Sequence, residues 1–122
     1  MKTLKATTVS YSENLEGREY FQVLFEEEGA PKRGGYVLLQ RQFEMPDGGE
    51  SYFECDEFER SGHYIIRKAK LSRNKFEIET PGRRGGKWAI SFELEEDRYE
   101  QLKEVLKIIL RKPSRLIIKG DS

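Results

Sequence analysis

The sequence has little of what most catalytic and metal centres use: its 122 residues include one cysteine, Cys55, and one histidine, His63. A structural zinc site uses four Cys or His ligands, so this chain is not expected to form one, and we expect no metal. A lone cysteine cannot form an intramolecular disulfide either. This favours a reducing compartment and predicts a cytoplasmic protein.

The chain also has no formal net charge, since 22 Lys and Arg balance 22 Asp and Glu. Nucleic acids and anionic membranes are bound through an excess of positive charge, so the overall charge favours neither partner. No apolar stretch approaches the roughly 20 residues of a membrane-spanning helix, and residues 1–11 lack the apolar segment of a signal peptide. We therefore expect no membrane partner, and any electrostatic function must come from separated patches.

The length and composition predict one folded domain, 1–122, because seven Phe and six Tyr are too many for a disordered chain. Seven segments carry the alternating pattern of β-strands, with turn residues between them. They lie near residues 2–11, 18–26, 35–43, 50–57, 62–71, 74–80 and 86–94. Their short connections favour hairpins and antiparallel neighbours. One of them, 62–71, offers apolar side chains on both faces.

After Leu94 the apolar spacing changes to three and four residues, which is the period of an amphipathic helix. The stripe consists of Tyr99, Leu102, Val105, Leu106, Ile109 and Leu110. Asp97 and Glu100 have the spacing of a capping box, and Pro113 cannot continue a helix. We therefore predict a helix over about 98–111.

Together these elements predict an α+β fold, with a largely antiparallel sheet of about seven strands, from about 2 to 94, packed against one C-terminal helix. One sheet face would be covered and the other open, which makes the open face the candidate working surface. The tail, 112–122, contains the apolar segment 116–118. This segment could form an eighth short strand or attach to a neighbouring copy, which would allow a homo-oligomer.

Catalysis has one candidate pair, Cys55 and His63. The two residues would lie opposite each other if the turn between the predicted strands 50–57 and 62–71 centred on Glu59. A buried structural thiol is the commoner role of such a cysteine, so we expect no enzyme. The glycine pairs at 34–35 and 85–86 match neither the P-loop nor the dinucleotide-binding fingerprint. They are typical of hairpins, and no cofactor is expected.

Charge is strongly segregated along the chain. Residues 44–59 contain seven acids and no base, namely Glu44, Asp47, Glu50, Glu54, Asp56, Glu57 and Glu59. Residues 60–75 contain six bases and no acid, namely Arg60, Arg67, Lys68, Lys70, Arg73 and Lys75. One interpretation is that the two blocks pair across strands, each pair contributing roughly a few tenths of a kcal/mol.

The other interpretation makes the acidic block a partner-binding surface. If Phe53 and Cys55 face the core, Tyr52, Glu54 and Asp56 must point outward together. An aromatic ring flanked by carboxylates would suit a basic partner, because the ring supplies desolvated contact while the acids steer association. We therefore predict partner binding by the acidic block together with Tyr52.

A nucleic-acid-binding module is the alternative function. Arg67, Lys68, Lys70, Arg73 and the hairpin residues Arg83 and Arg84 would then track phosphates, with Tyr64 stacking on a base. The balanced overall charge makes nucleic acid the less favoured partner.

Five stretches of the sequence carry a recognisable pattern, namely residues 36–41 (YVLLQR), 52–54 (YFE), 60–64 (RSGHY), 90–94 (ISFEL) and 99–103 (YEQLK). Together they resemble the tenth immunity-protein family of bacterial polymorphic toxin systems. The resemblance covers nearly all of residues 2–110 and rests on the order and spacing of these stretches. It implies a cytoplasmic protein that binds a cognate toxin domain and blocks it without catalysis.

Overall fold

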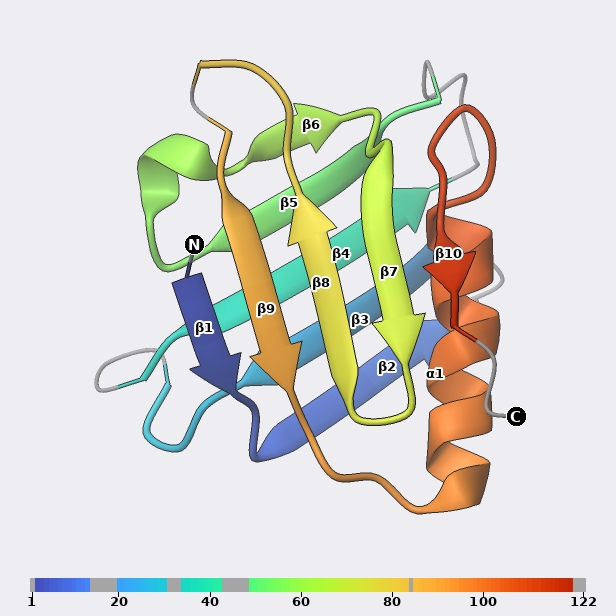
Figure 1. Ribbon diagram of the computed structural model, residues 1–122. Helices are drawn as coiled ribbons and strands as arrows, with labels where there is room; N and C mark the ends of the chain where they lie inside the picture. The colour runs from blue at the N-terminus through green and yellow to red at the C-terminus, as the bar shows by residue number, and fades with distance from the viewer. Residues whose placement is uncertain (1, 14–19, 31–33, 43–48, 84, 120–122) are drawn as a thin grey trace.

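The computed structural model describes residues 2–13, 20–30, 34–42, 49–83 and 85–119. Within these ranges the chain forms two five-stranded sheets, one in front of the other, and one α-helix beside the front sheet (Figure 1). The predicted α+β class is confirmed. The prediction of a single sheet of about seven strands is wrong.

The front sheet has the strand order β1-β9-β8-β7-β10 (Figure 1). Its strands are β1 (Lys2–Lys5), β7 (Lys68–Ser72), β8 (Lys75–Glu79), β9 (Lys87–Ser91) and β10 (Ile117–Ile118). The inner pairs are antiparallel, as expected for hairpins. The two edge pairs, β1 with β9 and β10 with β7, are parallel.

The rear sheet is antiparallel throughout and has the order β2-β3-β4-β5-β6. Its strands are β2 (Thr8–Glu13), β3 (Tyr20–Glu26), β4 (Tyr36–Gln42), β5 (Ser51–Cys55) and β6 (Gly62–Tyr64). A short 3-10 helix, η2 (Phe58–Arg60), connects β5 to β6.

The first predicted strand is in fact two strands, because the chain changes sheet in its middle. The backbone N–H of Ala6 donates to Ser91 of the front sheet (2.8 Å), whereas the N–H of Thr7 donates to Glu26 of the rear sheet (2.9 Å). The next buried side chain after Ala6 is Val9. An interval of three breaks the alternation of a single strand, so the slip in pattern marks the crossing.

The predicted strand 62–71 divides in the same way, into β6 and β7. Ile66 lies in the crossing segment, where its N–H donates to Ser114 Oγ (2.9 Å) and its C=O accepts from the N–H of Arg115 (2.7 Å). Ile66 is buried and the next buried side chain is Ala69, again three residues on. The two apolar faces of this segment thus belong to two strands that face the interior from opposite sheets.

Aromatic side chains fill the space between the two sheets. Phe25 of β3 stacks on Phe76 of β8 with 5.5 Å between ring centroids, and Phe53 of β5 lies 4.6 Å from Trp88 of β9. All four side chains are at most 2% exposed. Burying a side chain of this size contributes about 1.5–3 kcal/mol, so the two sheets stabilise each other through a common core.

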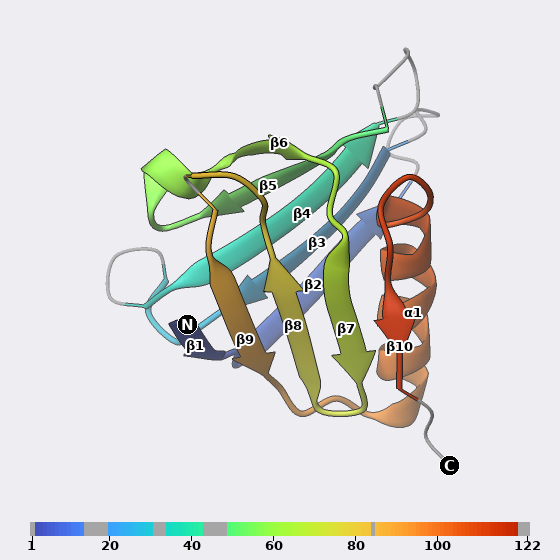
Figure 2. The same ribbon diagram turned by 45° about the horizontal axis from the view of Figure 1, so that its top comes forward.

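The helix α1 (Glu96–Ile109) packs on the side of the rear sheet that also faces the front sheet, where it contacts β2, β3 and β4 (Figure 2). Its predicted apolar stripe is confirmed, since every member from Tyr99 to Leu110 is buried. In the described ranges no helix has both the length and the apolar character that crossing a membrane requires.

The predicted helix start and cap are wrong. The helix begins at Glu96, and Glu95 occupies the N-cap position without a side-chain cap. Asp97 lies inside the first turn, where its carboxylate accepts the N–H of Arg98 at 2.9 Å. An acid in the first turn interacts favourably with the helix dipole, so Asp97 contributes without acting as the cap. The helix ends at Ile109, two residues earlier than predicted.

Two buried polar side chains attach the C-terminal end of α1 to the rear sheet. Arg41 Nη1 donates to the carbonyls of Ile109 (3.3 Å) and Arg111 (3.2 Å), and Ser51 Oγ donates to Ile109 (2.8 Å). Arg41 is 5% exposed. The last carbonyls of a helix have no partner within it and carry partial negative charge, so a guanidinium there is favourable.

Of the two alternatives for the tail, the structure shows the short strand. β10 pairs with β7, placing Ile117 beside Lys70, and the N–H of Lys119 donates to the carbonyl of Leu71 at 2.8 Å. The side chain of Ile117 is 43% exposed on the outer face of the front sheet.

Glu27, directly after β3, connects both sheets through its carboxylate. Its oxygens accept the backbone N–H of Lys5 at the end of β1 (3.0 Å) and the N–H of Gly35 before β4 (2.8 Å). Both backbone donors stabilise the ionised form and lower the pKa of Glu27 below its ordinary value. The hydrogen bond from Lys5 has the larger effect and the one from Gly35 the smaller.

We expect Arg41→Met to lower the free energy of unfolding by about 2–4 kcal/mol, because the carbonyls of Ile109 and Arg111 lose a charged donor at the end of the helix. Urea denaturation monitored by circular dichroism measures this. Gln42→Met, on the exposed end of the same strand, is the control and should change the value by less than about 0.5 kcal/mol. Equal effects of the two substitutions would contradict a role for Arg41 at the helix end.

We expect Glu27→Gln to lower the Tm at neutral pH. Because the folded-state pKa lies below the unfolded value of about 4.3, the stabilisation by the carboxylate is present at neutral pH and is lost as pH falls through the folded-state pKa. The Tm difference from wild type should therefore narrow below about pH 4. Glu28→Gln, at the exposed next residue, is the control. A difference that does not change with pH would exclude the charge of Glu27 as its source.

Candidate functional site

The two candidate catalytic side chains lie on opposite sides of the rear sheet. Cys55 faces the interior and is 1% exposed, whereas His63 is exposed on the outer face. The register pairs His63 with Tyr52, because η2 makes the connection asymmetric and Glu59 is not its centre. The predicted opposition of residues 55 and 63 is wrong.

Among the described residues, no group of three or more His, Cys, Asp or Glu is placed to hold a metal ion.

The structure brings together only part of the predicted acidic surface. Tyr52 and Glu54 point outward from β5 while Phe53 and Cys55 are buried, as predicted. The exposed residues Glu50, Asp56 and Glu59 lie at or beyond the ends of β5. Glu44 and Asp47 lie outside the described residues.

Glu57 has a different environment from the rest of the acidic block. Its carboxylate forms an ion pair with Lys2 of β1 and accepts a hydrogen bond from Nε of Arg60 at 2.5 Å. The hydrogen bonds from Lys2 and Arg60 lower the pKa of Glu57 below its ordinary value. Arg60 also donates to the carbonyl of Gly85, so Glu57 and Arg60 join η2 to the front sheet.

The outer face of the rear sheet carries aromatic, aliphatic, amide and acidic side chains; we call it the open face. The cross-strand register places Glu26 beside Tyr36, Leu24 in a row with Leu38 and Glu54, and Gln22 in a row with Gln40, Tyr52 and His63. No Lys or Arg occupies an outward position on the described part of β2–β6. This face points away from the front sheet and α1 (Figure 2).

The carboxylate of Glu54 is held between two tyrosine hydroxyls on the open face. Tyr36 donates to its Oε2 at 2.7 Å from the neighbouring strand, and Tyr52 donates to its Oε1 at 2.8 Å from the same strand. The Tyr52 ring is tilted against His63, with 5.1 Å between centroids. Glu54, Tyr36 and Tyr52 thus form a pre-positioned group across β4 and β5.

Both hydroxyls remain protonated at neutral pH. Burial and the hydrogen bond to Glu54 raise the pKa of Tyr36 above its ordinary value. For Tyr52 the hydrogen bond to Glu54 is the larger cause of its raised pKa, and burial is the second. Both tyrosines therefore act as hydrogen-bond donors to the carboxylate of Glu54 and hold it in one orientation.

A shallow hollow of about 300 Å³ lies beside this group on the open face. It is lined by Gln22, Leu24, Glu26, Tyr36, Leu38 and Glu54. Tyr36, Glu26 and the two leucines were not among the site residues predicted from the sequence. The signal was present in residues 36–40, where apolar and aromatic side chains occupy both faces of one strand, although an open sheet face needs only polar ones.

The acidic and basic blocks of the sequence lie in different sheets. Glu54 is in the rear sheet, whereas Lys68 and Lys70 are in the front sheet. Within the described ranges the blocks are joined by the ion pair of Glu57 with Arg60, only three residues apart. The interpretation that the blocks neutralise each other across strands is therefore wrong, and they form separate surfaces instead.

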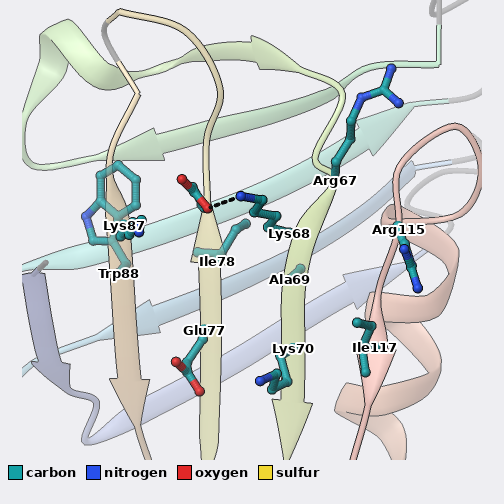
Figure 3. Close-up of a pocket in the computed structure, with 11 residues that line it drawn as sticks. Arg67, Lys68, Ala69, Lys70, Glu77, Ile78, Lys87, Trp88, Arg115 and Ile117 are labelled. Carbon is teal, nitrogen blue, oxygen red and sulfur yellow. Dashed lines mark ion pairs between the residues drawn. The ribbon is translucent and has the colours of Figure 1, made fainter.

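A second hollow, of about 600 Å³, lies on the outer face of the front sheet (Figure 3). Its charged lining consists of Arg67, Lys68, Lys70, Lys87, Arg115, Glu77 and Glu79. The two acids belong to β8, between the basic strands, and Glu79 pairs with Lys68 at 3.6 Å. Positive charge therefore predominates on the side formed by β7 and the tail, where Arg67 and Arg115 lie (Figure 3).

Two residues assigned to nucleic-acid binding are engaged in the fold. Tyr64 is half-buried, its hydroxyl donates to the carbonyl of Arg60 (2.9 Å), and its ring packs edge-on against Phe53. Arg73 donates to Leu94 (2.6 Å) and lies over the ring of Tyr99. The basic hollow thus gains neither the predicted base-stacking ring nor the Arg73 contact. Arg83 is exposed, and Arg84 lies outside the described residues.

We expect the thiol of Cys55 to react slowly with thiol reagents in the folded protein. Burial raises its pKa above the ordinary value, so little thiolate is present at neutral pH. Labelling should be at least about tenfold slower than in the same protein unfolded in urea. Native labelling as fast as that of the unfolded chain would contradict this and revive a nucleophilic role.

No protein-family model, no curated protein and no solved structure matches this chain. Function must therefore be inferred from the side chains on the two outer faces, together with the resemblance in the sequence.

Proposed function

We propose that this protein is a toxin-neutralising immunity protein that binds a cognate bacterial toxin domain through its open face. The carrying observation is the composition of that face. Tyr36, Tyr52 and Glu54 form a fixed group beside two half-buried leucines, and no Lys or Arg of the described residues faces outward there. The resemblance to the tenth immunity-protein family suggests the class of partner. Binding takes place in the cytoplasm and requires no catalytic residue.

The open face has the properties of a protein-binding surface. Protein interfaces obtain most of their affinity from a few aromatic or charged residues at the centre, surrounded by contacts that exclude water. Tyr52 and Tyr36 are held by their hydroxyls to Glu54, so binding immobilises them at little further cost in side-chain entropy. A partner covering this face would bury aromatic and aliphatic surface together.

The charge of this surface favours a basic toxin surface. Glu26 and Glu54 lie on the open face, while Glu50, Asp56 and Glu59 are exposed around β5. Carboxylates distributed in this way accelerate association with a positively charged partner and disfavour an acidic one. Inhibition then follows from occupation, because a toxin whose active site or essential surface is covered cannot reach its target.

Affinity capture from the bacterium that encodes this protein, followed by growth assays, tests the proposal. A captured protein should arrest growth when expressed alone in a laboratory bacterium, and co-expression of this chain should restore growth. Tyr52→Ala should weaken the purified complex by about 30-fold or more, since it removes a central aromatic contact. Asp56→Ala should weaken it as well, with a larger effect at low salt.

Lys70→Ala is the matched control, because Lys70 lies on the outer face of the other sheet. It should leave binding and growth rescue unchanged. A captured partner that does not arrest growth would overturn the immunity proposal. Loss of rescue by Lys70→Ala together with full rescue by Tyr52→Ala would move the contact surface to the basic hollow.

A nucleic-acid partner is the competing outcome of the same experiment. It would appear as co-purifying RNA and as salt-sensitive binding of single-stranded RNA by the purified chain. Lys70→Ala would then weaken RNA binding while Tyr52→Ala would not.

A further inference from the structure

The hollow on the open face combines three features that together specify one kind of occupant. Its apolar lining consists of Leu24 of β3 and Leu38 of β4, which are adjacent in register and only half-buried. Two carboxylates also line it, Glu26 of β3 and Glu54 of β5. The ring of Tyr36 completes the lining.

The carboxylate of Glu54 still has acceptor capacity for a ligand. Each of its oxygens accepts one tyrosine hydroxyl, from Tyr36 or from Tyr52. An ionised carboxylate offers about four acceptor positions, so roughly half remain for donors from outside. The two hydroxyls also fix the plane of the group, which prepares it for a donor that approaches in a defined orientation.

The negative charge of the hollow is not compensated within the described part of the chain. No Lys or Arg there forms an ion pair with Glu26 or Glu54, although Glu57, Glu79, Glu100 and Glu104 all have such partners. A half-buried carboxylate beside apolar surface favours a cation that tolerates partial desolvation.

We infer that this hollow receives an arginine side chain presented by the toxin, an inference that rests on the proposed function. The guanidinium would donate to the free positions of Glu54 and stack against Tyr36, while its methylene groups would cover Leu24 and Leu38. Arginine fits better than lysine, because its planar group donates in pairs, stacks on aromatic rings and is less strongly hydrated.

The test uses the whole protein and three blocked peptides of identical sequence whose central residue is arginine, lysine or citrulline. Citrulline keeps the shape of arginine and removes its charge. We expect the peptides to bind weakly, with Kd values in the millimolar range, which methyl NMR can detect. Titration with the arginine peptide should shift the Leu24 and Leu38 methyl signals. Its Kd should be about fivefold lower than that of the citrulline peptide, as expected for a half-exposed charge pair.

The Ile117 methyl signals are the internal control, because this exposed side chain lies on the other sheet and should not shift. Glu54→Gln should abolish the preference for arginine over citrulline. Glu77→Gln, which removes an acid from the basic hollow, should preserve it. Equal Kd values for arginine and citrulline, or an unchanged preference in Glu54→Gln, would overturn the inference.

These peptide measurements need no toxin, so their failure is distinguishable from failure of the proposed function. If the toxin is neutralised but the hollow shows no preference for arginine, the open face binds its partner by other contacts. If the captured partner is harmless, the immunity proposal falls whatever the peptides show. Where both hold, Glu54→Gln should weaken the toxin complex by about 30-fold, the lower range for a buried charge pair that loses one partner.

Discussion

Shared coverage of one sheet face is the constraint on which the rest of this structure depends. The inner side of the rear sheet meets the front sheet through rings such as Phe25 and Phe53, and it meets α1 near Arg41 and Ser51. Because both covering elements lie on the same side, the opposite side of the rear sheet has no cover among the described residues (Figure 2). The candidate binding surface is therefore a consequence of how the core is built.

The same arrangement separates charge in space. The chain carries its acids on β5 and the neighbouring segments and its bases on β7, and between these strands it crosses from the rear sheet to the front sheet. A single sheet would have placed the two blocks side by side, where they would have neutralised each other. In two sheets they become opposite outer faces, so a chain with no net charge can still offer an acidic surface to one partner.

Much of the local structure could be predicted because it depends on the periodicity of neighbouring residues. The apolar stripe of α1 and the outward direction of Tyr52 and Glu54 follow from periods of 3.6 and 2. The two crossings left a weaker signal, the intervals of three between Ala6 and Val9 and between Ile66 and Ala69. The partners of Glu54 could not be read in this way, because Tyr36 reaches it across a strand pair whose register the sequence pattern does not specify.

The sequence by itself determined the types of most elements, their approximate positions along the chain, the apolar stripe of the helix and the uneven distribution of charge, since all of these are properties of short segments. Only the tertiary structure decided that the ten strands of the described ranges divide into two sheets, that Cys55 and His63 face opposite ways, and that Tyr36, Tyr52 and Glu54 meet on one open face. The physical reason is that a strand's alternation states which side is buried, whereas backbone hydrogen bonds with distant segments decide which strand lies beside it.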